Sequence, residues 1–267
     1  MTGFRAKKSL GQHFLRDSRV ITKIIDSLSL EPSDEVLEIG PGRGHLTRSI
    51  LDKGALLTAI ELDYSLIEGP LAELQTKFTN FEVHHGDATG ISLSEIGIGN
   101  RPYKFVSNLP YNSGTRILRN ILFQSNPPEL SIVMLQKEVA DNIVNMENLG
   151  ILGPIFQSIA TCRRLFNVGP KSFNPPPKVR SSVIEFKPLK DPFINLSEKS
   201  AFMDFIFKGF SSPRKQLHNS LSKGLEFNLD RTKSLLEKSG VNPKLRPQKL
   251  SVLEWISIYD NYKKERS

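Results

Sequence analysis

Short apolar strands alternate with helical patterns between residues 35 and 135, and this alternation restricts the possible folds more than any other feature. Strands are predicted at 35–40, 56–62, 81–87, 104–108 and 130–135. Helices are predicted between them at 44–53, 66–78 and 113–124, the second interrupted early by Gly69-Pro70. Two further β-rich segments, 163–168 and 181–187, flank a proline loop. Strands spaced by helices indicate an α/β fold, a parallel sheet with helices on both faces.

The chain changes character near Pro188. Residues 198–210, 215–223, 230–239 and 250–263 all have helical patterns, with no strand predicted between them. We therefore expect two domains, an α/β domain over 1–188 and a smaller all-helical domain over 189–267.

The net charge of +8 is unevenly distributed along the 267 residues. Residues 1–24 hold six basic residues and one acidic residue, a net charge of +5. Residues 25–187 hold 15 basic and 18 acidic residues, a net charge of −3, and residues 188–267 hold 15 and nine, a net charge of +6. Two basic ends around an acidic middle are compatible with ordinary solvated faces or with two walls of a nucleic-acid groove. The candidates for phosphate contacts are Lys7, Lys8, Lys178, Arg214 and Lys215.

Cysteine content and hydropathy exclude several classes of protein. A single cysteine, Cys162, excludes an intrachain disulfide framework and suits a reducing cytosol. The longest uncharged stretch, 148–162, is too short to span a bilayer, and the N-terminus lacks the apolar run of a secretory signal. No spacing of the histidines with one another or with Cys162 predicts a metal site. We expect a cytoplasmic protein without a metal.

A glycine loop follows the first predicted strand. Its order, G-x-G-x-G, has His45 where the dinucleotide fingerprint requires glycine, and the chain contains no P-loop. Gly40 and Gly42 would let the backbone approach a ligand closely. Glu61 ends the second strand and could accept hydrogen bonds from both ribose hydroxyls, while Asp87 ends the third and could bind an adenine amino group. The pattern predicts a site for an adenosine without a pyrophosphate; a purely structural glycine loop is the alternative.

The fourth strand ends in Asn108-Leu109-Pro110-Tyr111, at the same sheet edge. An amide oxygen and a backbone carbonyl there could accept hydrogens from the exocyclic amine of adenine and free its nitrogen lone pair. Proline fixes the backbone, and Tyr111 offers a ring on which a base can stack. An ordinary turn after a strand is the alternative interpretation.

Seven motifs together resemble those of the ribosomal RNA adenine N6-dimethyltransferases in order and spacing. They are GQHFL (11–15), EIGPGRGHLT (38–47), IELD (60–63), GDAT (86–89), NLPY (108–111), MLQKE (134–138) and FNPPPKVRS (173–181). The resemblance covers essentially the whole chain. RKQLHNSL (214–221) and RPQKLS (246–251) favour the small-subunit, kasugamycin-resistance-type branch over the antibiotic-resistance methylases of large-subunit rRNA.

The resemblance implies a Rossmann-like class I S-adenosylmethionine-dependent methyltransferase sheet with a smaller all-helical C-terminal domain. It implies S-adenosyl-L-methionine as methyl donor, S-adenosyl-L-homocysteine as product and no metal. The implied reaction dimethylates N6 of two adjacent adenines in the 3′-terminal hairpin loop of small-subunit (16S) rRNA. The implied partner is the immature 30S subunit, bound by a monomer that uses neither DNA nor a membrane. The alternatives are an assembly checkpoint that chiefly binds the immature subunit, and a large-subunit rRNA adenine methylase.

Matching the family's positions residue by residue assigns a role to each motif. His13 and Leu15 would touch the methionine end of the cofactor, with Gly40 beneath it, and Gly42 is a further cofactor-binding candidate. Glu61 would bind the ribose and Asp87 the adenine. Asn108, Leu109, Pro110 and Tyr111 would surround the reacting amine, and Phe173 would stack on the target adenine opposite Tyr111.

Overall fold

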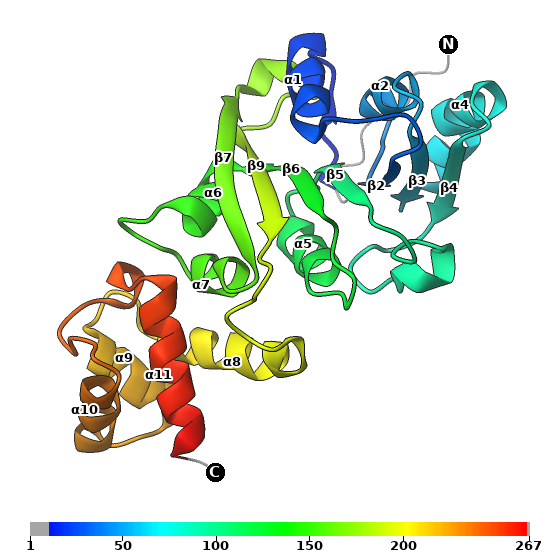
Figure 1. Ribbon diagram of the computed structural model, residues 1–267. Helices are drawn as coiled ribbons and strands as arrows, with labels where there is room; N and C mark the ends of the chain where they lie inside the picture. The colour runs from blue at the N-terminus through cyan, green and yellow to red at the C-terminus, as the bar shows by residue number, and fades with distance from the viewer. Residues whose placement is uncertain (1–10, 266–267) are drawn as a thin grey trace. The chain divides into compact units, whose positions relative to one another are not determined.

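The strands predicted between residues 35 and 135 lie side by side in one seven-stranded sheet (Figure 1). The computed structural model describes residues 11–265. The strand order is β4-β3-β2-β5-β6-β9-β7. The strands are β2 (Glu35–Ile39), β3 (Leu56–Glu61), β4 (Phe81–His85), β5 (Lys104–Asn108), β6 (Leu130–Gln136), β7 (Ala160–Val168) and β9 (Ser181–Pro188).

The sheet is mixed rather than purely parallel, which corrects the expectation from the sequence. Strands β4, β3, β2, β5 and β6 pair in parallel, whereas β9 pairs antiparallel with β6. The segment between β7 and β9 contains only a short 3₁₀ turn, Pro170–Ser172, and the two-residue strand β8 (Phe173–Asn174). Parallel neighbours are usually joined by a single helical crossover, and β9 does not follow β6 in this way, because β7 lies between them in the chain and leads into β9 without a helix.

Helices α1 (Ser18–Leu28) and α2 (His45–Leu51) cover one face of the sheet, and α5 (Gly114–Leu122) lies on the other side (Figure 1). Helix α1 was not anticipated from the sequence, although its buried side chains follow a helical period: Ile21, Ile24, Ile25 and Leu28. These side chains join one core cluster with apolar residues of α2, β2, β3, β5 and β6. Helix α5 buries its own apolar side chains, Ile117, Leu118, Ile121 and Leu122, on the other side of the sheet.

The helix predicted over 66–78 is interrupted where the sequence places Gly69-Pro70. The structure divides it into α3 (Tyr64–Leu66), a wide π turn (Ile67–Leu71) and α4 (Ala72–Lys77). Proline has no N–H to donate, and Gly69 adopts a non-helical φ of −102° and ψ of −107°. The predicted interruption is confirmed.

The chain folds into two compact units. The first comprises the residues up to 140 together with 163–188, and the second comprises 141–162 together with the residues from 189 onward. The second unit therefore includes a segment that the expected boundary after residue 188 assigned to the α/β domain. The reason is local packing within that unit: the Leu149 N–H donates to the Gln248 carbonyl over 2.8 Å, and the Lys249 ammonium donates to the Glu147 carbonyl over 3.1 Å.

The second unit is helical around an aromatic core. Its helices are α7 (Leu152–Gln157), α8 (Lys199–Gly209), α9 (Leu217–Leu225), α10 (Leu229–Lys238) and α11 (Val252–Lys264), while α6 (Lys137–Val144) bridges the division between the units. Trp255 is fully buried; the Phe210 ring stacks on it and the Phe205 ring meets it edge-on. The helical spacing of Trp255 with the apolar Val252 and Ile256 predicts this core position, and the prediction is confirmed. Residues 189–265 contain no strand, as predicted.

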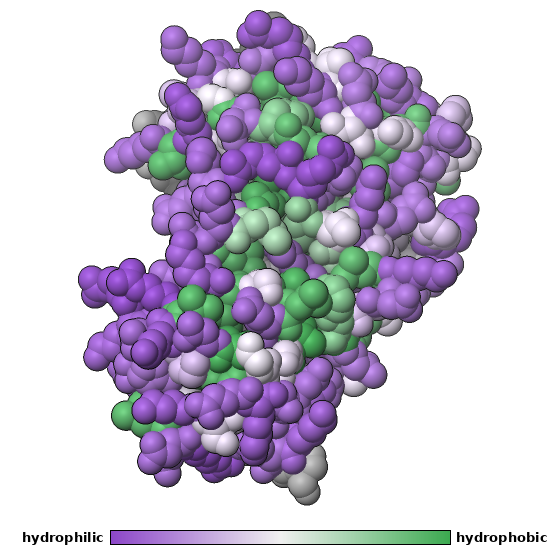
Figure 2. Space-filling model, turned by 60° about the vertical axis from the view of Figure 1, so that its left-hand side comes forward, coloured by the Kyte–Doolittle hydropathy of each residue, from purple (hydrophilic) through white to green (hydrophobic). Residues whose placement is uncertain are grey.

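The remaining strands and turns are short. Strand β1 (Phe14–Leu15) pairs antiparallel with β8, with Leu15 opposite Phe173. Further 3₁₀ turns occupy Leu93–Ile96, Leu196–Glu198 and Pro247–Lys249. Within residues 11–265, no helix has the length and apolar character needed to cross a membrane, and hydrophilic side chains cover most of the face shown in Figure 2.

Candidate active site

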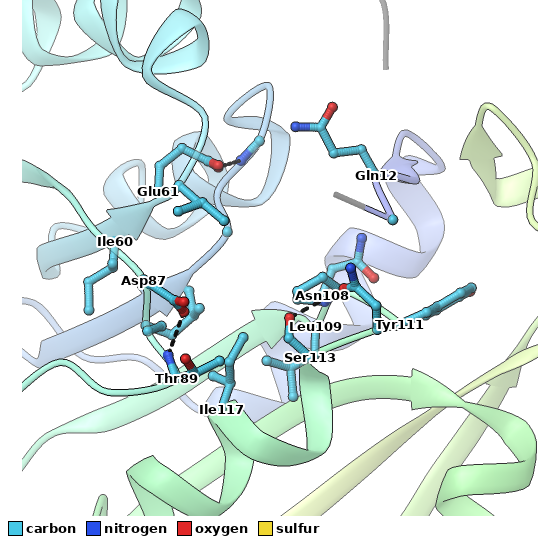
Figure 3. Close-up of a pocket in the computed structure, with 18 of the residues that line it drawn as sticks. Gln12, Ile60, Glu61, Asp87, Thr89, Asn108, Leu109, Tyr111, Ser113 and Ile117 are labelled. Carbon is cyan, nitrogen blue, oxygen red and sulfur yellow. Dashed lines mark hydrogen bonds between the residues drawn. The ribbon is translucent and has the colours of Figure 1, made fainter. Parts of the chain in front are cut away.

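A cavity of about 210 Å³ opens where the first four parallel strands end. Each strand contributes a residue to its wall: Gly40 follows β2, Glu61 ends β3, Asp87 follows β4 and Asn108 ends β5. Figure 3 shows Glu61, Asp87 and Asn108 arranged around this space. The carboxyl edge of an open α/β sheet is where such folds bind ligands.

Two glycines of the loop after β2 have left-handed backbones but different surroundings. Gly40 and Gly42 have φ of +67° and +60°. A Cβ at Gly40 would meet nothing within 4 Å, so this position faces open space in the cavity wall. A Cβ at Gly42 would lie 2.8 Å from the Phe14 ring. Gly40 therefore leaves room for a ligand, whereas Gly42 leaves room for another side chain of the protein.

Glu61 is a buried carboxylate bonded to two backbone amides. The Gly42 N–H donates to its Oε2 over 3.0 Å, and the Asp63 N–H donates to its Oε1 over 2.9 Å. Burial raises the pKa of Glu61, and the amide hydrogen bonds oppose that rise. The carboxylate is 6% exposed yet lines the cavity, so it is available to hydroxyl donors on a bound ligand.

Asp87 lies at an exposed part of the cavity wall. The backbone N–H of Thr89 donates to its Oδ1 over 2.9 Å, as Figure 3 shows. Hydrogen bonds from Thr89, and more weakly the charge of Arg116, lower the pKa of Asp87. The side chain is therefore ionised at neutral pH and accepts hydrogen bonds.

The Asn108 amide has a defined orientation. Its Nδ2 donates to the carbonyl oxygen of His13 over 2.9 Å. The following residues are fixed by the start of α5, because the Gly114 N–H donates to the Pro110 carbonyl over 2.7 Å. Leu109 is buried, with its N–H donating to the Met134 carbonyl.

Tyr111 forms a half-buried wall beside Asn108. Its hydroxyl lies 2.7 Å from the Ser181 hydroxyl, and its ring centroid lies 5.3 Å from that of His13. Both contacts restrict the tyrosine ring, whose pKa is raised by burial. A restricted aromatic ring is a suitable stacking surface.

Glu38 lies beneath the glycine loop and is 2% exposed. The Thr47 hydroxyl donates to its Oε2 over 2.7 Å. Burial, with a further contribution from the charge of Glu61, raises the pKa of Glu38 to about 8. The side chain is therefore largely protonated at neutral pH, which avoids a second negative charge beside Glu61.

The profile of the ribosomal RNA adenine dimethylase family matches residues 3–264. The chain belongs to this family. The dimethylase is 35% identical to "Ribosomal RNA small subunit methyltransferase A" of Dehalococcoides mccartyi, over 94% of this chain and 86% of the relative. It is therefore an S-adenosylmethionine-dependent rRNA adenine methyltransferase.

Two solved structures share the fold of the dimethylase. A dimethyladenosine transferase from Plasmodium falciparum aligns with a TM-score of 0.78 and 24% identity, over 95% of this chain and 98% of that one. The 23S rRNA methyltransferase ErmE aligns with a TM-score of 0.72 and 22% identity, over 94% and 99% of the two chains. The Rossmann-like methyltransferase fold expected from the sequence is confirmed.

Most of the residues that the sequence suggested for the dimethylase site lie on the cavity wall. They are His13, Gly40, Gly42, Glu61, Asp87, Asn108, Leu109, Pro110 and Tyr111. Leu15 and Phe173 do not line it. They pair across β1 and β8, and both belong to the apolar core, with Phe173 only 1% exposed. In this structure the Phe173 ring packs in the core beside β1 rather than facing the cavity, so the stacking role suggested for it stays a prediction.

Two further residues of the motif GQHFL, Gln12 and Phe14, line the cavity. The sequence motif contained them, but we had not predicted them as site residues. The Gln12 amide donates to Asp63 over 3.0 Å, and Figure 3 shows the Gln12 side chain extending toward the side of the site that carries Glu61. Neighbouring strand residues face opposite ways, so this alternation could have assigned Phe14 to the cavity and Leu15 to the core. Arg116 also lines the cavity, and no sequence pattern indicated it.

The basic residues suggested for RNA contacts are distributed over both units of the structure. Lys178 is exposed in the loop before β9, and Arg214 and Lys215 are exposed between α8 and α9 of the second unit. Lys7 and Lys8 lie outside the described residues. In the described part of the dimethylase, no three His, Cys, Asp or Glu side chains form a group that could hold a metal ion.

Proposed function

We propose that this dimethylase transfers methyl groups from S-adenosylmethionine to N6 of two adjacent adenines in the 3′-terminal hairpin loop of small-subunit rRNA. The supporting observation is that Glu61, Asp87 and Asn108 converge on one cavity from the ends of three strands. The 35% identity to a protein named for the small ribosomal subunit favours that substrate over large-subunit rRNA.

The cavity suits the proposed cofactor. Gly40 offers open space for the methionine end, next to the half-buried His13. The buried Glu61 carboxylate accepts hydrogen bonds from the ribose hydroxyls, and the ionised Asp87 accepts from the adenine amino group. When bound, the cofactor supplies an electrophilic methyl group on a positively charged sulfur.

Asn108 and the backbone after it bind the target amine. With its Nδ2 bonded to His13, the Asn108 amide has its oxygen left to accept a hydrogen from N6. We assign the second acceptor to the Leu109 carbonyl, because the Pro110 carbonyl already accepts the Gly114 N–H. Two acceptors hold the amine towards sp³ geometry and free its lone pair. Tyr111 stacks on the base, which contributes about 1–3 kcal/mol.

S-adenosylmethionine held at this site would supply the methyl group. The N6 lone pair forms the new N–C bond as the S–C bond breaks, and the proton released from N6 passes to water. A base inside a helix cannot reach such a cavity, so the adenine lies in a loop or is flipped out. The protein contributes positioning and stabilises the positive charge as it moves from sulfur to nitrogen. A monomethylated amine retains one N–H and can therefore react a second time.

The substrate particle in this proposal is the immature 30S subunit, bound in the cytoplasm by a monomer. We propose that Arg214 and Lys215 of the second unit and Lys178 of the first, all exposed, contact RNA phosphates. Neither DNA nor a membrane takes part.

The test is radiolabelled methyl transfer to undermethylated small subunits, large subunits and DNA, followed by mapping of the labelled nucleotide. We expect label only on two adjacent adenines of the small subunit. Asn108→Ala is measured in parallel and should abolish most transfer while RNA affinity is retained. Label on large subunits alone, or transfer by Asn108→Ala at the wild-type rate, would contradict the proposal. Wild-type binding to small subunits without any transfer would favour an assembly checkpoint.

A further inference from the structure

We infer that His13 is a positioning residue for methyl transfer: its backbone carbonyl fixes the orientation of the Asn108 amide, and its imidazole anchors that carbonyl. This inference rests on the proposed function, because it concerns the group that binds the target amine. It gives His13 a role that is separate from any contact with the cofactor.

The hydrogen bond between the two residues selects one of two amide orientations. A side-chain amide turned by 180° exchanges its NH₂ and its oxygen with little change in shape. The His13 carbonyl can only accept, so at 2.9 Å it requires the NH₂ of Asn108. The Asn108 oxygen is thereby kept on the other side, where it can accept a hydrogen from N6. In the reversed orientation an N–H would face the N–H groups of the target amine.

The imidazole of His13 holds the segment that supplies this carbonyl. Its Nδ1 lies 2.8 Å from the carbonyl oxygen of Pro175. A carbonyl does not donate, so Nδ1 carries the hydrogen in this contact. The tether joins the loop after β8 to the segment before β1, beside the backbone pairing of Phe14 with Asn174.

The segment is also held on the side of the glycine loop. The Gln12 amide donates to Asp63 over 3.0 Å, and the Arg43 guanidinium lies 5.1 Å from the Phe14 ring centroid. The His13 carbonyl therefore lies between two anchored flanks. Of these interactions, the imidazole tether is the one made by the residue that carries the carbonyl, so its loss should affect Asn108 most directly.

Two uncharged substitutions of similar shape separate the loss of the hydrogen bond to Pro175 from the loss of the imidazole ring. His13→Asn keeps an N–H donor at the δ position, within reach of the Pro175 carbonyl. His13→Leu has nearly the shape of asparagine and no donor. At saturating S-adenosylmethionine and RNA, we expect kcat of His13→Leu to fall about 10- to 100-fold. His13→Asn should restore kcat to within about threefold of wild type, since the hydrogen bond is rebuilt.

Nuclear magnetic resonance of the Asn108 side-chain amide supplies a readout that needs no catalysis. In the wild type we expect two well-separated proton signals from an amide held by one hydrogen bond. In His13→Leu the two signals should approach one another and exchange faster, and in His13→Asn they should remain wild-type-like. Asn108→Ala assigns the signals, and thermal denaturation of each variant establishes that it is folded.

The outcomes separate this inference from the proposed function. If His13→Leu regains wild-type kcat at saturating cofactor, His13 acts only through cofactor affinity and the inference is wrong. Unchanged Asn108 signals in a folded His13→Leu variant would also overturn it. If instead the Asn108 signals respond as expected and the wild type methylates no ribosomal subunit, the positioning role stands and the proposed function fails.

Discussion

The backbone N–H of Gly42 donates to the Glu61 carboxylate over 3.0 Å and so joins the glycine loop to the end of the neighbouring strand. Glu61 therefore has two tasks, to shape the loop and to receive the ribose. The hydrogen bond that shapes the loop is present without a ligand, whereas ribose binding is the role that we propose. Substitutions around this hydrogen bond can separate them.

Replacing Glu61 should reduce both cofactor affinity and stability. Glu61→Gln leaves one oxygen acceptor for two backbone donors, Gly42 and Asp63. We expect S-adenosylmethionine affinity to fall about 10- to 100-fold and the free energy of unfolding to fall by about 1–3 kcal/mol. Calorimetric titration and urea unfolding measure these quantities. Glu68→Gln, the same change at an exposed position nearby, is the control and should alter neither.

Alanine substitutions at the two loop glycines, Gly40 and Gly42, should have different effects on cofactor binding and on Tm. Alanine at either position has a left-handed backbone, which costs about 1–2 kcal/mol. Gly40→Ala adds a methyl group toward open space in the cavity wall, so it should weaken cofactor binding more than it lowers Tm. Gly42→Ala places the methyl group against the Phe14 ring, so it should lower Tm further. Equal Tm values for the two variants would contradict this assignment.

Glu38 should make stability depend on pH. Its pKa rises from an ordinary 4.5 to about 8 in the folded protein, so the folded state holds the proton more tightly than the unfolded state. The associated stability is fully present below about pH 4.5 and is lost as the pH rises through about 8. Glu38→Gln keeps an acceptor for the Thr47 hydroxyl and should remove this decline. Urea unfolding followed by circular dichroism at several pH values checks it; parallel curves for the two proteins would refute the prediction.

The pKa of Asp87 should determine the pH below which affinity for the cofactor is lost. The pKa of Asp87 is lowered, so the ionised form persists to acidic pH, and affinity is lost as the pH falls through that lowered value. Arg116→Gln should move this loss to higher pH, and Thr89→Val should move it further, because the Thr89 hydroxyl lowers the pKa of Asp87 more than Arg116 does. Calorimetric titration across acidic pH measures the shift. Arg119→Gln, on the same helix, is the control, and a reversed order of the two variants would contradict the assignment.

The basic residues of the second unit should act through phosphates. Replacing Arg214 and Lys215 together with glutamine should flatten the slope of log affinity against log salt by about 1.4, or about 0.7 for each phosphate of unpaired RNA that is no longer neutralised. Fluorescence titration with a hairpin RNA at several salt concentrations measures this slope. Lys233→Gln with Lys244→Gln removes the same charge from exposed positions of the same unit. If both pairs flatten the slope equally, the effect belongs to net charge rather than to specific phosphate binding.

Positions in the active site that follow directly from strand ends were predictable from the sequence. Glu61 and Asp87 could be placed because parallel strands end at one edge, and Asn108 by the same reasoning. The helix interruption at Gly69-Pro70 followed from the missing proline N–H. Trp255 was assigned to the core by its helical spacing with apolar neighbours.

Features that depend on the packing of distant segments were not predictable in this way. Phe173 belongs to a motif that also carries Lys178, yet its ring packs in the core because β8 pairs with β1. The direction of β9 depends on how the chain returns from β7, and a strand pattern does not encode direction. The segment 141–162 packs with later helices through backbone hydrogen bonds that its own residues do not reveal.

The hydrogen bond between His13 and Pro175 spans 162 positions of the chain. During synthesis, the parallel strands up to β6 are available to pair long before Pro175 has been made. The segment that orients Asn108 must therefore lack this tether until the chain has been made beyond the proline loop, although Gln12 and Phe14 already have their partners, Asp63 and Arg43. A ribosome-bound chain that ends after β6 would contain the five parallel strands and most of the residues that line the cavity, but not the partner of this tether. The orientation of Asn108 is therefore completed late in translation.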